Sequence, residues 1–432
     1  MSLFSALGTS VSGLTAQSAA FGNISDNVAN SQTVGYKEVD TSFIDYLTTS
    51  TSQQNDPGAV ATRPDYTNSV QGTISQSSDP LALAITGNGF FAVSESNGVA
   101  SGTNDPTFDS QTYYTRAGDF HLDKNGYLVN SAGEYLQGWA VNPSTGAANQ
   151  SSLAPIQIAQ TRSNPVATSQ ISVSANLPVS TAGGSSVGPQ TVDIYDSLGN
   201  QHTISLNWTP QGGNAWSLTV GSPDVSGGPI GSATVQFGTN GAAAGTIGSF
   251  SGATGLTPSP ASTNGPASLT FTANFGSGPQ TITLGLGHYG QQDGLTQFAG
   301  DTANPRFTTD GVPAGNFTGI TMTNTGGVMA NYDNGQSQLV AQVPVITFAN
   351  ADALQRQNGQ AFTTSLQSGA AVAQAAGANG AGSLVTGSVE SSNVDIASEF
   401  SKLIVAQEAY GANAKMITTA DAMLQVTLNM KT

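Results

Sequence analysis

The sequence predicts a mainly β, multi-domain protein whose two ends are long, paired α-helices of the coiled-coil type. Three observations favour this fold class: apolar residues recur at helical spacing near both ends, short alternating segments fill the middle, and turn residues separate them. The chain has 432 residues, of which 52 are Gly and 19 are Pro, a composition typical of turn-rich β domains. A chain of this length is expected to form about two to four domains.

The N-terminal helix is predicted from a heptad-like stripe that ends where Asn and Gly can cap a helix, near residues 30–35. The stripe consists of Phe4, Leu7, Val11, Leu14, Phe21, Ile24 and Val28. Asp26 is the only charged residue before Lys37, so we expect several faces of this helix to contact protein. Its internal glycines each cost about 1 kcal/mol relative to alanine, so it is expected to form only against a partner.

The C-terminal helix is predicted from apolar residues in alternating steps of four and three. The stripe contains Ile396, Phe400, Leu403, Tyr410, Ile417, Leu424 and Leu428. Ser392 or Asn393 is the expected N-cap, with Asp395 and Glu399 near the positive end of the helix dipole. The two helices could form an intramolecular hairpin on the β body. They could also pair and then pack against the same pair in neighbouring subunits, as in the core of a polymer.

The middle of the chain is predicted to be β-rich. Strands are expected at 90–93, 113–115, 120–122, 127–129, 171–173, 203–208, 216–220, 270–273, 281–284 and 339–348. Asn125-Gly126 predicts a tight hairpin, and 370–382 is interpreted as an Ala/Gly linker. The expected domains are 1–34 with 388–432 (terminal helices), 35–145 with 295–387 (β framework with linkers), and 146–294 (inserted outer β domain).

Charge and cysteine content exclude several function classes. The chain has 10 Lys+Arg against 26 Asp+Glu, a net charge of -16, so neither nucleic acid nor an anionic membrane is an expected partner. It has no cysteine, which excludes disulfides, thiolate catalysis and Cys-based zinc sites. The first 35 residues contain no Lys or Arg, unlike a secretory signal peptide, and no apolar run is long enough to predict a membrane span.

Three motif matches do not support catalysis or ligand binding. Residues 184–188 match G-x-S-x-G and precede His202, but they lie in a Gly/Ser loop rather than between a strand and a helix. Residues 285–290 match G-x-G-x-x-G without a following apolar helix. Residues 121–126 resemble the start of a calcium loop, whose twelfth position would be Ala132 rather than Glu. We therefore expect no enzyme, no catalytic or metal-binding residues and no cofactor.

Four segments resemble signatures of the bacterial flagellar rod and hook protein family. They are 29–37, 87–93, 114–139 and 390–415. The residues that carry the two terminal signatures are Asn30, Thr33, Gly35, Tyr36, Asn393, Asp395, Gln407 and Asn413. The motifs cover both ends and much of the framework, and together they are highly specific.

The long insert is similar to the hook-type members of this family. A rod protein would be much shorter, whereas segments 195–202, 295–300 and 332–335 match hook patterns. Glu408 departs from the family, which commonly has Arg there, so a basic contact made by relatives is not expected here. Residues 221–266 carry no recognised motif.

The resemblance implies a structural, extracellular subunit of the flagellar hook, which is a hollow, flexible tube acting as a universal joint between the motor rod and the filament. The terminal helices would form the inner tube, and the β domains would form outer layers that slide as the tube bends. The implied partners are other copies of the chain, the rod, hook cap and hook–filament junction proteins, and the flagellar type III export machinery. The alternatives are another flagellar axial protein (distal rod or hook–filament junction) and a secreted β-rich adhesin or surface-layer protein.

Overall fold

A computed structural model describes residues 3–50, 55–100, 105–142, 146–179, 184–226, 228–300 and 305–429. The described residues are mainly β, and their α-helices occur only at the two ends of the chain. This confirms the predicted fold class. The chain divides into two compact units. Unit 1 comprises 1–160, 319–331 and 337–432, and unit 2 comprises 161–318 and 332–336.

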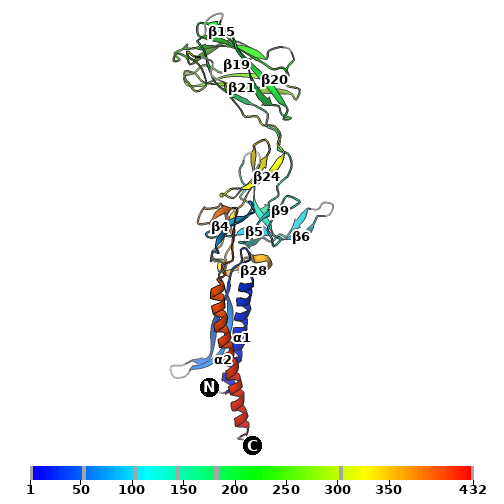
Figure 1. Cartoon of the computed structure of the whole chain (residues 1–432), viewed down its shortest axis with the longest axis vertical. Helices are drawn as coiled ribbons and strands as arrows, with labels where there is room; N and C mark the ends of the chain where they lie inside the picture. The colour runs from blue at the N-terminus through cyan, green and yellow to red at the C-terminus, as the bar shows by residue number, and fades with distance from the viewer. Residues whose placement is uncertain are drawn as a thin grey trace. The chain divides into compact units, whose positions relative to one another are not determined.

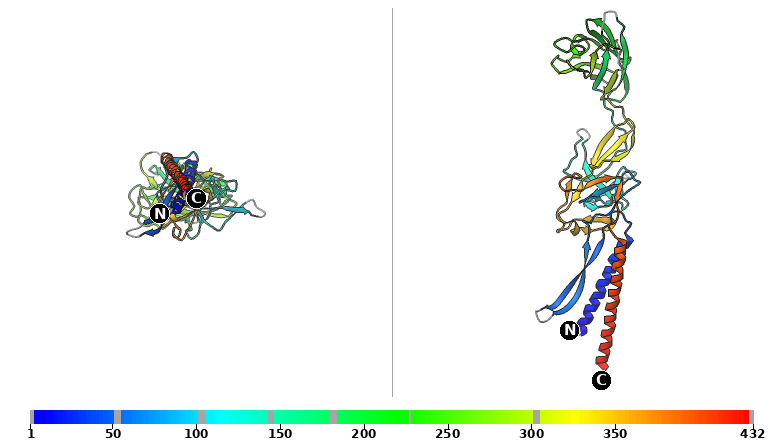
Figure 2. Two further views of the ribbon diagram at one scale, coloured as in Figure 1. Left: turned by 90° about the horizontal axis from the view of Figure 1, so that it is seen from below. Right: turned by 60° about the vertical axis from the view of Figure 1, so that its left-hand side comes forward.

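The two terminal helices lie side by side and run antiparallel (Figures 1 and 2). The first, α1, spans Leu3–Ala29, and the second, α2, spans Ile396–Asn429. The predicted N-cap of α2 was wrong: Asp395 accepts hydrogen bonds from the backbone N–H groups of Ala397 (2.9 Å) and Ser398 (3.2 Å), which is the N-cap geometry. The Asn393 side chain is occupied elsewhere, because its Oδ1 accepts from the backbone N–H of Glu38 at 2.7 Å.

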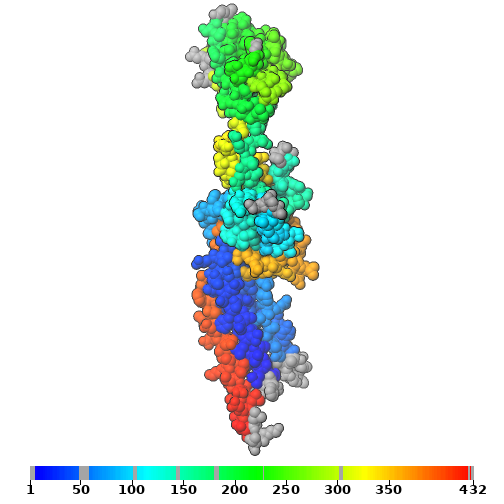
Figure 3. Space-filling view, turned by 90° about the vertical axis from the view of Figure 1, so that its right-hand side faces the viewer, coloured from blue at the N-terminus to red at the C-terminus, as the bar shows by residue number. Residues whose placement is uncertain are grey.

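A long antiparallel hairpin accompanies the helices. Its strands are β1 (Val39–Ser50) and β2 (Asn55–Tyr66), paired from Val39↔Tyr66 to Ser50↔Asn55. Figure 3 shows these strands (light blue) along one side of α1 (dark blue), with α2 (orange to red) along the other side. The hairpin thus lies along the helix pair.

The β part of unit 1 is organised around one large sheet and several two-stranded ribbons. The main sheet has the order β24 (Phe317–Met322), β25 (Gly327–Tyr332), β26 (Ser337–Gln342), β11 (Tyr135–Ala140), β5 (Phe91–Ser94), β8 (Tyr113–Thr115), β29 (Ala361–Thr363), β28 (Gln355–Arg356). In addition, β10 (Leu128–Val129) and β12 (Ala154–Pro155) pair with β11, and β9 (His121–Leu122) pairs with β10. The ribbons are β3 (Ile74–Gln76) with β32 (Ser388–Glu390), β4 (Leu83–Thr86) with β31 (Ser383–Thr386), β6 (Ser96–Val99) with β7 (Pro106–Phe108), and β27 (Val345–Thr347) with β30 (Val372–Gln374). The β3–β32 and β4–β31 ribbons therefore pair strands from the N-terminal part of the chain with strands from its C-terminal part.

Aromatic side chains fill the core beside this sheet. Phe90 packs edge-to-face on Phe362 (5.7 Å between ring centroids) and on Phe348 (5.8 Å). Tyr114 contacts Phe348 in the same way at 4.9 Å. Such pairs favour edge-to-face geometry, so the ring positions fix how the strands from both halves of the chain meet.

Unit 2 consists of two sheets that share one core. A meander is formed by β14 (Val187–Tyr195), β15 (Gln201–Gly212), β16 (Ala215–Gly221), β17 (Gly231–Phe237) and β18 (Ile247–Thr254). The other sheet contains β19 (Thr257–Pro258), β20 (Pro266–Asn274), β21 (Pro279–His288), β13 (Gln170–Leu177), β22 (Leu295–Gln297) and β23 (Arg306–Thr309). Trp208 and Trp216 are buried in the common core. Burial alternates along the strands, as in β17, which is the pattern of a β-sandwich.

Most of the expected strands exist, and the differences from expectation are local. The Asn125-Gly126 hairpin is present: β9 pairs with β10, and Gly126 has a positive φ of 83°. Residues 370–382 are not simply a linker, because β30 lies within them and pairs with β27. The inserted segment expected at 146–294 lacks β22 and β23, which pair with β13 within unit 2.

Candidate assembly surface on the terminal helices

The two helices meet along a seam of small and polar residues. A Cβ on Gly13 would lie 2.9 Å from the Nδ2 of Asn413, so the glycine lets this side chain approach α1 closely. Farther toward the C-terminal end of α1, the rings of Phe21 and Tyr410 pack edge-to-face with 6.2 Å between their centroids. Farther along, the Nδ2 of Asn27 donates to the Oε2 of Glu399 at 2.9 Å. The seam therefore combines close backbone approach with specific polar contacts.

The predicted stripe residues divide between the seam and the outer faces. Ile24 is buried, and Leu7, Leu14, Phe21, Val28, Leu403, Ile417 and Leu424 are half-buried. Val11, Ile396, Phe400 and Tyr410 are exposed. The side chains of Phe4 and Leu428 lie outside the described residues. The sequence predicted one apolar row on the side of α2 that contacts α1. The buried residues of α2 are instead Glu399, Ala406 and Ala420, which do not belong to that row. Phe400 and Gln407 therefore lie outside the seam.

Sequence reasoning missed a second set of exposed apolar side chains on α2. They are Ile404, Val405, Met416, Met423 and Val426, which are between 55% and 68% exposed. Val405, Met416, Met423 and Val426 fall on a second 4-3 row, offset from the predicted one, so a search for a single stripe passes over them. The signal that could have found them is this second row of apolar residues at the same spacing. Several large apolar side chains exposed on one helix indicate an interaction site.

The N-terminal signature residues anchor the end of α1. Asn30 donates through Nδ2 to the carbonyl oxygen of Asp26 (2.9 Å), and Thr33 donates to the Oδ1 of Asn30 (3.2 Å). Gly35 has a φ of 71°, and a Cβ there would lie 2.4 Å from the backbone nitrogen of Ala117, so glycine is required. These contacts turn the chain directly from the helix into the β body.

Tyr36 directly follows Gly35 and contacts the end of α1. Its hydroxyl donates to Asp26 Oδ2 (2.9 Å) or Asn27 Oδ1 (3.0 Å), and the guanidinium of Arg356 lies over its ring at 4.3 Å. Burial, the largest cause, raises the pKa of Tyr36 to about 12, although the Arg356 charge opposes this shift. The phenol thus stays neutral and can donate its hydrogen bond.

A buried charge triad links the roots of both helices. It consists of Lys37, Arg116 and Glu390, each no more than 1% exposed. The Nζ of Lys37 lies 2.6 Å from Glu390 Oε1, and the Nη1 of Arg116 lies 2.9 Å from Glu390 Oε2. Burial lowers the pKa values of Lys37 and Arg116, and the Glu390 carboxylate opposes this effect. Removing Glu390 would leave two buried cations without their counter-charge.

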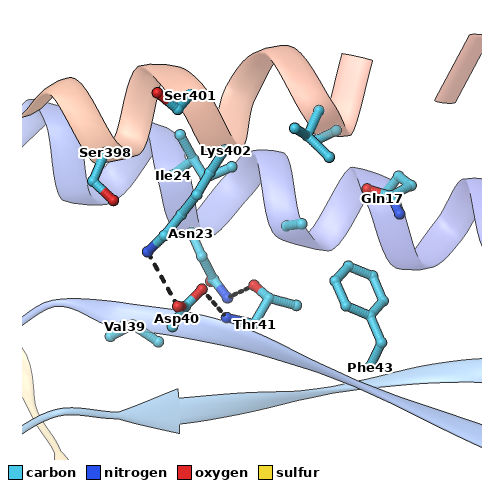
Figure 4. A pocket seen from close by; sticks show the side chains of 13 residues that line it. Gln17, Asn23, Ile24, Val39, Asp40, Thr41, Phe43, Ser398, Ser401 and Lys402 are labelled. Atoms are coloured by element: carbon cyan, nitrogen blue, oxygen red, sulfur yellow. Dashed lines mark hydrogen bonds and ion pairs between the residues drawn. The ribbon is translucent and has the colours of Figure 1, made fainter. Parts of the chain in front are cut away.

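A groove lies where α1, α2 and β1 meet, and we call it the terminal groove (Figure 4). Its volume is about 390 Å³, and it is lined by Gln17, Ala20, Asn23, Ile24, Val39, Asp40, Thr41, Phe43, Ser398, Ser401, Lys402, Val405 and Ala406. Asn23 donates to Thr41 Oγ1 at 2.8 Å, which ties α1 to β1. Both helices and the hairpin therefore build one concave site.

Lys402 connects α2 to the start of the hairpin. Its Nζ lies 2.6 Å from Glu38 Oε1, 3.1 Å from Asp40 Oδ2 and 2.8 Å from Glu399 Oε1. Burial alone would lower the pKa of Lys402, but its hydrogen bonds to Glu38, Glu399 and Asp40 outweigh burial and raise that pKa above the usual lysine value. Lys402 is therefore a fixed cation surrounded by carboxylates.

The rejected sequence motifs have structural explanations. The Nδ1 of His202 faces Asp224 Oδ2 at 3.0 Å, and its ring stacks on Phe275 at 4.6 Å. Asp123 accepts backbone hydrogen bonds within the turn between β9 and β10. No described residues bring together three side chains able to hold a metal ion. Among the described helices, none combines the length and the hydropathy needed to cross a bilayer.

Comparison with known proteins gives consistent family matches along the chain. Family models match at residues 7–37 (Flagella basal body rod protein), 84–181 (Flagellar hook protein FlgE/F/G D1 domain), 185–312 (Flagellar basal body protein FlaE D2 domain) and 385–430 (Flagellar basal body rod FlgEFG protein C-terminal).

Whole-chain relatives agree with these matches. The flagellar hook protein FlgE of Brucella abortus is 31% identical over 100% of both chains, and that of Salmonella typhimurium is 30% identical over 98% of both. The crystal structure of Helicobacter pylori flagellar hook protein FlgE2 has a TM-score of 0.50 and 14% identity, covering 73% of this chain and 100% of that one. This last similarity concerns the fold alone.

Proposed function

The chain belongs to the flagellar hook protein family, and from that premise we propose that its copies are held together by the exposed apolar faces of α1 and α2. The protein is a structural subunit of the extracellular hook attached to the flagellar basal body, and its homologues are structural flagellar hook proteins.

The observation that carries the proposal is the exposure of large apolar side chains on helices whose seam is already filled. Phe400, Ile404 and Val405 are 52%, 60% and 68% exposed although α2 is paired with α1. Burying such a side chain contributes about 1.5–3 kcal/mol. Helices that keep this surface after pairing are expected to bury it against other copies. We therefore propose that the predicted stripe residues serve both the pairing of α1 with α2 and the contacts between copies.

The surface of unit 2 supports a role in the flexible outer layer. Between Arg162 and Arg306 the chain contains no Lys or Arg, so ion pairs between copies are few there. Neutral polar surfaces can re-form hydrogen bonds after small displacements, whereas ion pairs have stricter geometry. We propose that this unit slides against its neighbours as the tube bends. Helix pair, β framework and insert are proposed as the three functional domains.

The further partners are proposed from the family. They are the rod, the hook cap, the hook–filament junction proteins and the type III export machinery. The scarcity of charge on α1 and its internal glycines support export as an unfolded chain, because an isolated α1 is only marginally stable. Assembly would then fold the helices at the growing end.

A pair of matched valines tests the assembly surface. We expect Val405→Ser to raise the protein concentration needed for tube formation, while Val99→Ser leaves it unchanged. Val99 is a suitable control because it is 69% exposed, like Val405, but lies on β6. Electron microscopy of purified protein at high concentration or salt measures assembly. Equal effects of the two substitutions would contradict the proposal, as would globular particles from the wild type under all conditions.

Deleting residues 1–30 provides a second arm. The truncated chain should fail to form tubes while unit 2 stays folded, as reported by the fluorescence of Trp208 and Trp216. Tubes from the truncated chain would show that α1 is not an assembly element.

A further inference from the structure

The terminal groove has an apolar part and an acidic part. Ala20, Ile24, Phe43, Val405 and Ala406 supply the apolar lining. Phe43 is 48% exposed although it lines the groove, so its ring is only partly covered by this chain (Figure 4). The space of about 390 Å³ accommodates a side chain supplied from outside.

The acidic part carries an excess of negative charge. Asp40 and Lys402 line the groove, and Glu38 and Glu399, which do not line it, also contact Lys402, so three carboxylates surround one cation and leave two negative charges. Asp40 is 47% exposed at its side chain, so part of this charge is accessible from outside the chain. A ligand that fits both parts of the groove carries an apolar side chain next to a cation.

The described chain offers this combination on α2, one residue after another. Lys415 is exposed and forms no ion pair with any described residue, and Met416 is 57% exposed. Neither residue lines the terminal groove of its own chain. Methionine is flexible and suited to irregular apolar spaces.

The other basic residues of the described chain outside the groove are less suitable. Arg63 and Arg162 stand beside polar residues or proline in the sequence, and the Phe307 side chain that follows Arg306 packs on the core of unit 2. Lys37 and Arg116 belong to the buried charge triad, and Arg356 lies over Tyr36. Lys124 follows Asp123 in a tight hairpin turn and has no apolar neighbour in sequence. Charge complementarity thus favours the Lys415–Met416 segment.

We propose that the terminal groove of one copy binds the Lys415–Met416 segment of a second copy, with the ammonium group near Asp40 and the methionine side chain against Phe43. The inference rests on the proposed function, because it needs an assembled polymer. It adds a polar contact that sets the register between copies, which an apolar surface alone specifies poorly. It also overcomes locally the repulsion between chains that each carry a net charge of -16.

Cysteine cross-linking tests the contact directly, because the chain has no cysteine of its own. Two singly substituted proteins, Phe43→Cys and Met416→Cys, are mixed, assembled into tubes and oxidised. A covalent dimer that contains one of each chain supports the inference. In the control mixture, Asn97→Cys replaces Phe43→Cys, and no such dimer is expected. Tubes that give no more dimer than the control would overturn the inference and leave the proposed function intact. Failure of wild-type protein to form tubes would overturn both.

A matched pair of charge reversals supplies a second measurement. Lys415→Glu and Lys124→Glu change the net charge equally, and both lysines are exposed. We expect Lys415→Glu to raise the critical concentration for assembly about tenfold, equivalent to about 1.4 kcal/mol, and Lys124→Glu to change it much less. Lys415→Arg should assemble like the wild type. Near-ultraviolet circular dichroism checks that the monomers stay folded. Equal behaviour of the two reversals would overturn the inference.

Discussion

Glu134 is a buried carboxylate that weakens the fold at neutral pH, and replacing it by glutamine should reveal the cost. The residue is 2% exposed. Its Oε2 accepts a hydrogen bond from Asn130 Nδ2 at 2.7 Å, whereas Oε1 has no hydrogen-bond partner among the described residues. Burial raises the pKa of Glu134 to about 7; the Asn130 hydrogen bond opposes this, and the charges of Glu95 and Asp119 add to it.

The size of the effect follows from the two pKa values. In the unfolded chain the carboxyl group titrates near its ordinary value of 4.5. Below pH 4.5 both states hold the proton. Between pH 4.5 and about 7 the unfolded chain releases it first, so the free energy of unfolding falls as pH rises. Above about pH 7 the free energy of unfolding is lower by a constant amount of about 3 kcal/mol, because each pKa unit corresponds to about 1.4 kcal/mol.

Glutamine has the shape of the protonated carboxyl group and keeps an acceptor for Asn130. Glu134→Gln should therefore stabilise unit 1 by up to about 3 kcal/mol at pH 8 and by almost nothing at pH 4.5. Urea unfolding of protein labelled with 5-fluorotryptophan and followed by ¹⁹F NMR separates the two units. Trp139 reports unit 1, and Trp208 and Trp216 report unit 2, which serves as the internal control.

The exposed Glu408→Gln is the matched chemical control and should show no pH-dependent gain. Equal stabilisation by Glu134→Gln at both pH values would refute the reasoning. A urea midpoint of unit 1 that Glu134→Gln leaves unchanged at pH 8 would also refute it.

Three further substitutions test the helix pair and its attachment. Glu390→Gln should destabilise unit 1 by about 3–5 kcal/mol, because Lys37 and Arg116 lose their buried counter-charge; urea unfolding measures this loss. Asp395→Ala should lower the free energy of unfolding by about 0.5–2 kcal/mol, because the N-cap of α2 is lost. Asp395→Asn should keep most of the stability in the same assay, because asparagine also caps helices. Gly13→Val should prevent tube formation without changing the unfolding of unit 2, because the added side chain would overlap α2; normal tubes seen by electron microscopy would contradict the described seam.

The sequence was sufficient to predict the helices but not everything that packs on them. Residues at heptad spacing recur over many turns, so the helical pattern is strong. The hairpin of β1 and β2 was missed because Pro57, Gly58 and Pro64 weaken the strand pattern, although proline is compatible with an edge strand. The N-cap of α2 was misplaced because several capping residues occur together before Ile396. Only tertiary contacts show that Asn393 is engaged with Glu38.

The terminal groove could not be predicted from the sequence. It is built from residues near positions 20, 40 and 400, and their approach depends on the pairing of α1, α2 and β1. Lys402 and Asp40 give no local signal, because neither belongs to a motif and their proximity arises only after folding. The same is true of the buried charge triad, whose members come from three separate segments.

The contacts at the helix roots also determine when α1 can fold. Lys37 and Glu390 are 353 residues apart in the sequence, and Asn27 and Glu399 are 372 apart. A chain that emerges from its N-terminus therefore carries α1 without its partners until almost all of its length has followed. Contacts of such long range form late, because closing the loop between them costs conformational entropy first. The segment that we propose for the assembly surface is thus the first to be made and the last to be completed.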